Sequence, residues 1–408
     1  MKILIVTQYY FPETFKSNDL SFELQKRGHD VTVLTGLPNY PKGQLYDGYG
    51  VFKNRRQVIN GVKVIRSLLV LRGNGGGIRL FLNYFSFAFF ASVKAFFLNF
   101  SHKYDAVIVH EPSPITQFYP ALLLKKMQKV PIYFWVMDLW PESLEILGGV
   151  RNKAILNIFT KMVINFYENS EKILITSRGF KRSILEKGNF EDKLEYFPNW
   201  SEDSVSEGDQ NFPVPNLPEG FKVMFAGNIG EAQDMESVMN AALELKNNHE
   251  IKFIIVGDGR KMPFVRDFIK DHNLEKTVFC LGRFPIEAMA SFFAKADVML
   301  VSLRDDKIFN LTVPAKVQAY MSASKPIVAM LNGEGANIIE EAKCGLSLPA
   351  GDSKGLAFIL KTMVQYEKSQ LEKMGENSRI FYSENFQLTQ CIDNLERILG
   401  LKTVVEKS

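Results

Sequence analysis

The stretch Val223-Met224-Phe225-Ala226-Gly227-Asn228-Ile229-Gly230-Glu231-Ala232-Gln233 joins a short apolar run to a glycine-rich turn. The run Val223–Ala226 predicts a buried strand, and a helix-length segment follows the turn. Glycine in such a turn lets the backbone approach a diphosphate, and the next helix start supplies free N–H groups. A tight turn that only needs small residues explains the same pattern, so this stretch alone leaves both interpretations open.

The same design recurs twice further along the chain. Val256-Gly257-Asp258-Gly259-Arg260 follows a predicted strand, and Leu281-Gly282-Arg283-Phe284-Pro285 follows another. The strands predicted in this half are Val223–Ala226, Phe253–Val256, Val278–Leu281, Val298–Val301 and Pro326–Ala329. Strands that alternate with helix-length segments predict a doubly wound parallel sheet, whose ligands bind beyond the carboxyl ends of its strands. Three glycine turns in one sheet favour a nucleotide site.

A lysine near a predicted helix start extends this site. Pro314 is well suited to the first turn of a helix, and Lys316 follows two residues later. A lysine beside unsatisfied N–H groups forms a positive pocket for phosphate oxygens. The alternative is an ordinary surface lysine.

The first half of the chain contains a second alternating pattern. Its predicted strands are Ile3–Thr7, Val31–Thr35, Val62–Ser67, Ala106–His110, Ile132–Val136 and Ile173–Thr176. The first helix is predicted from Ser17 to Arg27, with Gly28 at the left-handed cap position. The chain has 408 residues, more than one hydrophobic core usually supports. We therefore predict an N-terminal domain over 1–198, a polar, proline-rich linker over 199–220 and a C-terminal domain over 221–384.

Polar side chains also follow two strands of the first half. His110 ends one strand and Asp138 follows the next, so both can face one cleft and hold a sugar hydroxyl or shield a developing positive charge. Packing is the alternative for His110 and helix capping for Asp138. Trp140 either packs in the core or stacks beneath a sugar ring.

Composition excludes several classes of protein. The isolated cysteines Cys280, Cys344 and Cys391 form neither a zinc motif nor a disulfide framework, which suits a reducing compartment. A net charge of +4 without a recognition motif does not indicate nucleic-acid binding. The opening apolar run is shorter than a secretory signal. We expect a cytoplasmic protein whose mild basicity suits work at an anionic membrane surface.

The segment Ile78–Phe100 is apolar and long enough to span a bilayer. On a helical wheel Arg79, Asn83, Ser86 and Lys94 share a stripe that Phe90 interrupts. A polar stripe with a cation in mid-helix argues against a membrane span. A helix buried against the sheet and a helix whose phenylalanine face enters a membrane interface both fit.

Short motifs extend in one order over nearly the whole chain. They are Tyr10-Phe11-Pro12-Glu13, Arg27–Gly36, Pro38-Asn39-Tyr40-Pro41, Asp138-Leu139-Trp140-Pro141-Glu142, Gly227-Asn228-Ile229-Gly230, Gln233, Val256-Gly257-Asp258-Gly259 and Pro314-Ala315-Lys316. With these motifs the chain resembles glycosyltransferase family 4 of the GT-B fold, in its O-antigen, capsule and colanic-acid branch with fucosamine-transferase-like members. The resemblance implies an α/β protein of two Rossmann-like domains facing across a cleft, with a helix at about 385–402 returning to the first.

The resemblance also implies an activity. It is the retaining, metal-independent transfer of a sugar from a nucleotide diphosphate, most simply a UDP-sugar such as a UDP-N-acetylated deoxyhexosamine, onto a lipid-linked glycan at the inner face of the membrane. Donor-binding residues are then Gly227, Asn228, Gly230, Gln233, Gly257, Gly259, Arg283, Phe284, Arg304 and Pro314. Acceptor-side residues are Glu13, Asn18, Tyr40, Trp140 and Glu142. The catalytic residues are Asp138, His110 and Lys316.

The sequence departs from this family in three places. Asn228 and Gln233 occupy the positions of an Arg and a Lys that grip the diphosphate in many members. Leu311 and Ala319 replace a pair of glutamates eight positions apart. Phe15 and Lys16 stand in place of paired glycines. Lys316, with Arg304 or Arg283, is the candidate for the missing cation.

Two other functions fit the same fold. A UDP-sugar 2-epimerase uses such a cleft without a lipid acceptor, and a catalytically silent sugar-nucleotide-binding subunit explains the missing charged pairs. The adjacent Asp305 and Asp306 are a weak metal cage, so we expect neither a metal nor an organic cofactor. The expected partners are a nucleotide sugar, a lipid-linked glycan and the membrane surface, without nucleic acid.

Overall fold

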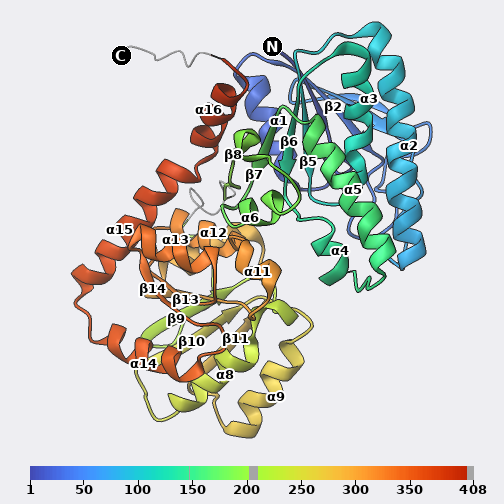
Figure 1. Cartoon of the computed structure of the whole chain (residues 1–408). Coiled ribbons are helices and arrows are strands. Elements are labelled where there is room, and N and C mark those ends of the chain that lie inside the picture. Colours follow the sequence, from blue (N-terminus) through green and yellow to red (C-terminus); the bar gives the residue numbers. More distant parts are fainter. Residues whose placement is uncertain (147, 202–209, 402–408) are drawn as a thin grey trace. The chain divides into compact units, whose positions relative to one another are not determined.

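The computed structural model describes residues 1–146, 148–201 and 210–401. Its chain forms two compact units, Met1–Phe197 with Ile392–Ser408, and Pro198–Cys391 (Figure 1). Of the predicted linker 199–220, residues 202–209 lie outside the described residues, and strand β9 begins at Phe221. Each unit is an α/β structure built on its own sheet, which confirms the predicted fold class of two Rossmann-like units.

The N-terminal unit contains an eight-stranded sheet in the order β3-β4-β2-β1-β5-β6-β7-β8. Its strands are β1 (Lys2–Val6), β2 (Asp30–Gly36), β3 (Arg56–Ile59), β4 (Val62–Ser67), β5 (Ala106–Glu111), β6 (Ile132–Val136), β7 (Lys172–Ile175) and β8 (Leu194–Tyr196). Neighbours are parallel except at β3, which pairs antiparallel with β4 at the sheet edge. β3 and β8 were not predicted, because short, partly exposed strands carry no apolar run.

Helices cover this sheet. They are α1 (Lys16–Lys26), α2 (Gly77–Ser101), α3 (Tyr119–Gln128), α4 (Glu142–Ile146), α5 (Lys153–Asn169) and α6 (Phe180–Leu185), with short 3-10 turns at Ile115–Phe118 and Glu191–Lys193. Gly28 follows α1 with φ of +88°, so the predicted left-handed cap position is correct.

The C-terminal unit contains a six-stranded parallel sheet in the order β11-β10-β9-β12-β13-β14. Its strands are β9 (Phe221–Ala226), β10 (Ile251–Val256), β11 (Val278–Gly282), β12 (Val298–Ser302), β13 (Ile327–Met330) and β14 (Gly345–Leu348). Its helices are α8 (Met235–Glu244), α9 (Met262–His272), α10 (Met289–Ala294), α11 (Lys307–Leu311), α12 (Ala315–Ser322), α13 (Glu334–Ala342), α14 (Ser353–Val364) and α15 (Lys368–Asn385), with 3-10 turns at Glu231–Gln233 and Ile286–Ala288.

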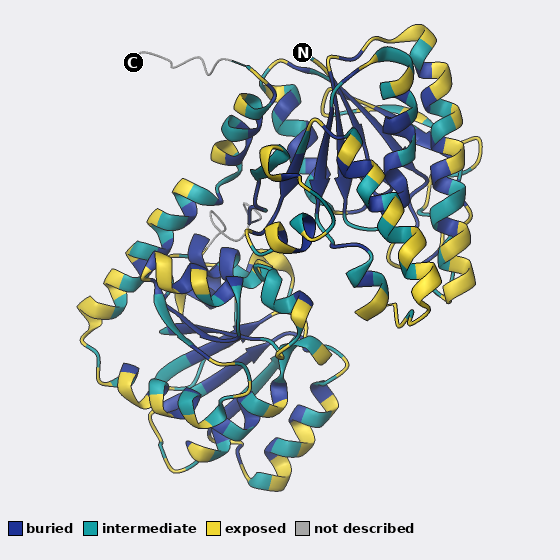
Figure 2. Cartoon of the chain, viewed as in Figure 1, coloured by how far each residue is buried: buried dark blue, intermediate teal, exposed yellow. Residues whose placement is uncertain are grey.

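Both sheets lie inside their units. The inner strands of each sheet, such as β1, β5 and β6 in one and β10, β12 and β13 in the other, are mainly dark blue in Figure 2, because side chains on both of their faces are covered. In the C-terminal unit one apolar core joins Phe225 and Phe253 of the sheet to Val238 of α8 and Leu360 of α14. Parallel strands buried on both faces explain the continuous apolar runs in the sequence.

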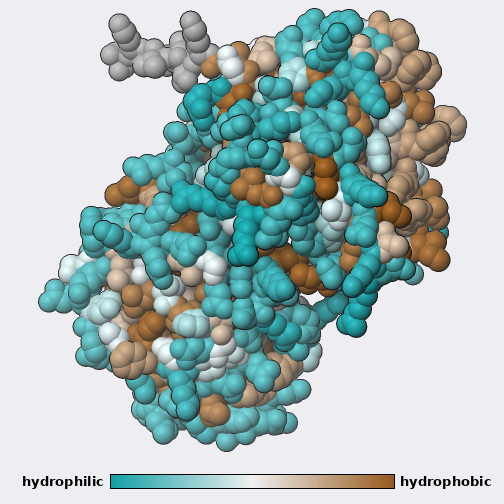
Figure 3. All heavy atoms as spheres, in the orientation of Figure 1, coloured by the Kyte–Doolittle hydropathy of each residue, from teal (hydrophilic) through white to brown (hydrophobic). Residues whose placement is uncertain are grey.

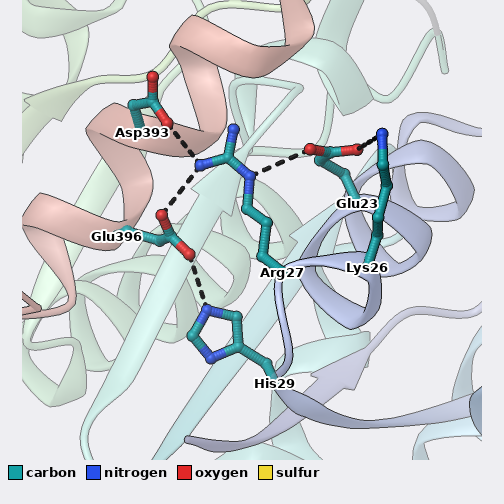
Figure 4. A network of polar contacts seen from close by, with 6 residues as sticks. All are labelled: Glu23, Lys26, Arg27, His29, Asp393 and Glu396. Atoms are coloured by element: carbon teal, nitrogen blue, oxygen red, sulfur yellow. Dashed lines mark hydrogen bonds and ion pairs between the residues drawn. The ribbon is translucent and has the colours of Figure 1, made fainter. Parts of the chain in front are cut away.

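The last helix, α16 (Leu388–Ile398), is attached to the N-terminal unit by a charged network (Figure 4). The Arg27 guanidinium donates to Asp393 at 2.5 Å and to Glu396 at 2.9 Å on α16, and to Glu23 of α1 at 3.0 Å. The ring of His29 lies 2.7 Å from Glu396. One guanidinium therefore holds three carboxylates from two helices, and its donor geometry suits such a role.

Helix α2 buries Asn83, Phe87, Ala88, Ala91, Ala95 and Leu98 and presents most of its phenylalanines outward. Asn83 is fully buried, where it accepts from Gln8 at 2.7 Å and donates to the Val70 carbonyl at 2.6 Å. Ser86 accepts from Val70 N–H at 2.8 Å, and Arg79 donates to the Leu71 carbonyl at 3.1 Å. Three members of the stripe predicted from the sequence, Arg79, Asn83 and Ser86, thus form hydrogen bonds within the unit.

The outer face of α2 is apolar. Its exposed side chains are Ile78, Phe81, Leu82, Phe89, Phe90, Val93, Phe96, Phe97 and Phe100. They form the brown edge at the right of Figure 3. Within the described residues α2 is the one helix whose length and hydropathy suffice to cross a membrane, a test that core helices of soluble proteins also pass. Exposed aromatic surface of this extent marks an interaction site.

Candidate functional site

The three glycine turns of the C-terminal unit follow β9, β10 and β11, and the first lies at the carboxyl end of β9, between β10 on one side and β12 on the other. The chain passes from β9 to β10 in one direction and later returns to β12 on the opposite side of β9. This is the topological switch point of a doubly wound sheet, where ligands bind.

The first two turns are in backbone contact. A Cβ atom at residue 257 would lie 1.9 Å from the carbonyl oxygen of Gly227, and Gly257 has φ of +141°. The N–H of Gly227 donates to Val256 at 2.8 Å, and that of Gly257 donates to Gly282 at 2.8 Å. Glycine is therefore required at residue 257 by both space and backbone conformation. A tight turn that needs a small residue explains Gly257 whether or not the turn binds a ligand.

Lys316 lies beside the first turn. A Cβ atom at residue 227 would lie 2.8 Å from the Lys316 Cε. The Lys316 ammonium lies 4.4 Å from the centre of the Phe225 ring, within cation–π range. Among the described residues no carboxylate pairs with it, and burial lowers the pKa of Lys316 to about 8. At neutral pH it is a protonated, partly buried cation that lacks an anion.

Tyr320 holds the helix that carries Lys316. Its hydroxyl accepts from the Ala226 N–H at 3.0 Å and donates to the Ala226 carbonyl at 3.1 Å. Because Tyr320 lies one turn after Lys316 on α12, these bonds fix α12 against the end of β9. Neither Tyr320 nor Phe225 was identified from the sequence, because their roles depend on contacts between distant segments.

Two amides stand where the resemblance led us to expect cations. The Gln233 side chain accepts from the Gly230 N–H at 2.9 Å, so it shapes the turn. A Cβ atom at residue 230 would lie 2.7 Å from Asn228 Nδ2, and one at residue 259 would lie 2.8 Å from Asn228 Oδ1. The structure therefore brings together Gly227, Asn228, Gly230, Gln233, Gly257, Gly259 and Lys316.

The other predicted donor residues are less closely associated. Arg304 lies 3.4 Å from Glu231, which also pairs with Lys261 at 3.1 Å. Arg283 is exposed, and Phe284 packs edge-on against Phe292. Pro314 occupies the N-cap of α12.

Asp305 and Asp306 each accept a hydrogen bond from a residue nearby in the sequence. Asp306 caps α11 by accepting from the Ile308 N–H at 2.9 Å, and Asp305 accepts from Asn310 at 2.8 Å. Over the described ranges 1–146, 148–201 and 210–401, no group of three His, Cys, Asp or Glu side chains is placed to hold a metal ion.

In the N-terminal unit His110 is enclosed. Its Nδ1 lies 3.3 Å from the Thr7 hydroxyl, which itself donates to the Tyr9 carbonyl, so His110 Nδ1 is the donor. Its ring packs against Trp135 at 4.6 Å. Burial, then the charge of Lys16, lowers the pKa of His110 to about 3. The imidazole is neutral and faces Thr7, and no hydrogen bond joins it to Asp138 in the described structure.

Asp138 belongs to a neighbouring group of polar side chains. It accepts from Ser113 at 2.6 Å, and Ser113 accepts from the Trp140 indole at 3.1 Å. Burial raises the pKa of Asp138. Trp140 is buried against Phe159, which favours its core interpretation.

Glu111 was not among the candidate residues. It is fully buried, and burial, then the charge of Asp138, raises its pKa well above the usual range while backbone N–H groups oppose this. The neutral form of Glu111 is therefore favoured beside Asp138, relative to an exposed glutamate. The available signal was an acid at the end of a strand that we ended one residue early, at His110.

The other acceptor-side candidates hold loops together. The Glu13 carboxylate accepts from the N–H groups of Asn39 at 2.7 Å, Tyr40 at 2.6 Å and Tyr10 at 3.2 Å, and Asn18 donates to the Glu13 carbonyl at 2.8 Å. Tyr40 is partly exposed and packs with Tyr9 and Phe15. Glu142, separately, accepts from Ser183 at 2.6 Å and Lys187 at 2.5 Å.

Two family models match this chain. Residues 17–200 match a "Glycosyl transferase 4-like domain" and residues 220–365 match "Glycosyl transferases group 1". The chain belongs to the group 1 glycosyltransferases. The resemblance read from its motifs is therefore correct.

Curated relatives of this glycosyltransferase agree. The "Probable glycosyltransferase WbjE" of Pseudomonas aeruginosa is 30% identical over 62% of this chain and 66% of its own length. The "Putative colanic acid biosynthesis glycosyl transferase WcaI" of Escherichia coli K12 is 26% identical over 71% of this chain and 72% of its own. The alignment thus spans about two thirds of each relative.

The fold has solved counterparts. The crystal structure of Anabaena HepE in complex with UDP is 14% identical, with a TM-score of 0.69 over 98% of this chain and 100% of that one. At this identity the likeness shows the fold alone. It confirms that the glycosyltransferase has the predicted GT-B architecture.

We predict that His110 of the glycosyltransferase stays neutral down to at least pH 5. Its lowered pKa means that the unfolded chain takes up a proton below about pH 6.5 that the folded chain does not, so His110 destabilises the fold as the pH falls towards 3. NMR of the histidine rings, with His110→Gln to assign the signal, should show no His110 titration between pH 8 and pH 5. A titration midpoint near that of free histidine would contradict this.

Proposed function

We propose that this protein is a retaining, metal-independent glycosyltransferase that moves a sugar from UDP to a lipid-linked glycan in cell-surface polysaccharide biosynthesis. The observation that carries the proposal is Lys316, an unpaired cation beside the glycine turns at the switch point of the C-terminal sheet. UDP as the carrier is supported by the UDP complex of HepE, and a polysaccharide product by the name of WcaI. A UDP-N-acetylated deoxyhexosamine is a suitable donor.

The departing diphosphate needs its developing charge stabilised. Asn228 and Gln233 offer hydrogen bonds but no charge, and Gln233 already accepts from Gly230. Arg304 and Lys261 both pair with Glu231, so the Arg304 guanidinium is less available to a diphosphate. Lys316 has no such competitor among the described residues, and a bound diphosphate would raise its pKa again and keep it protonated. Lys316 therefore supplies the leaving-group charge in this proposal.

On the acceptor side we assign Asp138 the polar contact with the sugar. Asp138 accepts a hydrogen bond from Ser113, whereas Glu111 is fully enclosed and burial, then the charge of Asp138, raises its pKa. Burial raises the pKa of both carboxyl groups and disfavours their ionised, nucleophilic forms, so this pair gives no support to a covalent glycosyl-enzyme. His110, neutral and bonded to Thr7, supports the end of β1 in this account.

The lipid acceptor is supported by helix α2. Its outward phenylalanines form an apolar face, while Asn83 and Ser86 form hydrogen bonds within the unit. We propose that this face lies in the interfacial region of the inner membrane, so the protein is cytoplasmic and peripherally attached. Such attachment distinguishes a transferase for lipid-linked glycans from an epimerase acting on free UDP-sugars.

UDP should bind without a divalent metal. The reason is that Lys316 and the turn amides supply the positive groups that a metal would otherwise provide. Calorimetry of UDP in the presence of a chelator should show a saturable exchange of heat, with GDP as the matched control for the base. Affinity that appears only after magnesium or manganese is added would contradict the proposal.

Replacing Lys316 with Met should lower turnover about 100-fold or more, as expected for one lost preorganised charge in a closed site. The stem length is nearly kept, so the melting temperature should change little. Arg304→Met and Arg283→Met are the matched controls, each removing one cation from the same unit. Near-normal turnover in Lys316→Met with a large loss in either control would mean that the cation was misassigned.

Attachment through α2 should be weakened by the double change Phe89→Ser and Phe97→Ser. Both side chains are mostly exposed, at 64% and 63%, so the fold should be unaffected. In flotation with anionic liposomes, wild type should bind reversibly with salt and the variant should bind several-fold less. Phe358→Ser, at an equally exposed phenylalanine of α14, is the control. Release by detergent alone would favour a membrane span.

A further inference from the structure

A second apolar element of the N-terminal unit lies outside α2, in the loop before β3. Gly50 and Lys53 exchange two backbone hydrogen bonds of 3.3 Å, which closes a tight turn with Val51 and Phe52 at its tip. Phe52 is 95% exposed, more than any other large apolar side chain in the described part of the chain. A phenylalanine at a turn tip contributes nothing to the core.

The tip is braced from behind. The Asn54 amide donates to the Gly48 carbonyl at 2.9 Å. The Arg55 guanidinium donates to the Val51 carbonyl at 2.9 Å and to the Arg66 carbonyl at 2.8 Å, which ties the turn to β4. Phe52 is therefore presented by a fixed loop.

Cations collect at the base of this turn. Lys53, Arg55 and Arg56 follow the tip, and Lys94 comes from α2. Burial, then the charges of Arg55 and Arg56, lowers the pKa of Lys94, so these groups are near one another. None of the four forms an ion pair with a carboxylate among the residues that the structure describes. Like charges gathered without a counter-ion favour an anionic partner.

We propose that this turn is a second membrane contact, in which Val51 and Phe52 enter the interface of a bilayer while Lys53, Arg56 and Lys94 bind anionic phospholipid headgroups. An apolar tip rimmed by unpaired cations has the chemistry of such a surface. Lys94 connects the turn to α2, so both elements meet the same lipid. The inference rests on the membrane attachment proposed for α2.

The test is vesicle co-sedimentation of the full chain, with vesicles of phosphatidylcholine alone and with phosphatidylglycerol added. Phe52→Ser should weaken binding to the anionic vesicles about fivefold or more. Lys53→Gln with Arg56→Gln should weaken it roughly tenfold or more and remove most of the dependence on phosphatidylglycerol. Arg55 is left unchanged because it braces the loop.

Matched controls come from α14, where Phe358 is 71% exposed and Lys354 and Lys361 are also exposed. Phe358→Ser and the pair Lys354→Gln with Lys361→Gln make the same changes of area and charge and should bind as wild type. UDP affinity should be unchanged in all variants, which confirms folding.

The outcomes separate two failures. If wild type binds no vesicles, the proposed attachment through α2 is wrong and this inference falls with it. If wild type binds and the α2 variant does not, while the loop variants bind normally, only the inference is overturned. Equal binding to neutral and anionic vesicles would overturn the headgroup part of it.

Discussion

The donor side depends on one backbone contact. The carbonyl oxygen of Gly227 lies where the first side-chain atom of residue 257 would begin, at 1.9 Å, so the turns after β9 and β10 touch directly. The space that Gly227 leaves open is filled by the Lys316 side chain, whose Cε would lie 2.8 Å from a Cβ there. A substituent at either glycine would displace a neighbouring turn or the lysine. The position of the Lys316 ammonium thus depends on residues 227 and 257 having no side chain.

The sequence predicted these turns and Lys316 because their signals are local. An apolar run, a glycine at its end and a proline before a lysine can each be recognised within a few residues. The partners of Lys316 could not be found in this way. Tyr320 bonds to Ala226 across 94 positions of sequence, and Phe225 looks like any buried strand residue until α12 packs over it. The glycine turns and Lys316 could be predicted from the sequence, but the residues that hold Lys316 in place depend on tertiary contacts.

The N-terminal unit shows the reverse case. Glu13 and Glu142 stand in motifs of the family, and both carboxylates are engaged within their own unit, with backbone N–H groups or with Ser183 and Lys187. Glu111, which no motif singled out, is the enclosed acid beside Asp138. Complete burial raises the pKa of Glu111, and no pattern of residue types along a strand measures burial at a sheet end. The family motifs therefore indicate which region of the chain to inspect, but the role of each side chain there depends on its packing.

A helical wheel separates the two faces of α2 but does not say which one meets the protein. The buried face of α2 is itself apolar, formed by Phe87, Ala88, Ala91, Ala95 and Leu98, and Asn83 joins it because it finds partners at Gln8 and Val70. Leaving the Asn83 amide buried without partners would cost about 1–3 kcal/mol, so its hydrogen bonds help to fix the orientation. Most of the phenylalanines then face outward. At roughly 25 cal/mol per Å² of apolar surface, water is an unfavourable environment for such a face, and a lipid interface removes that cost.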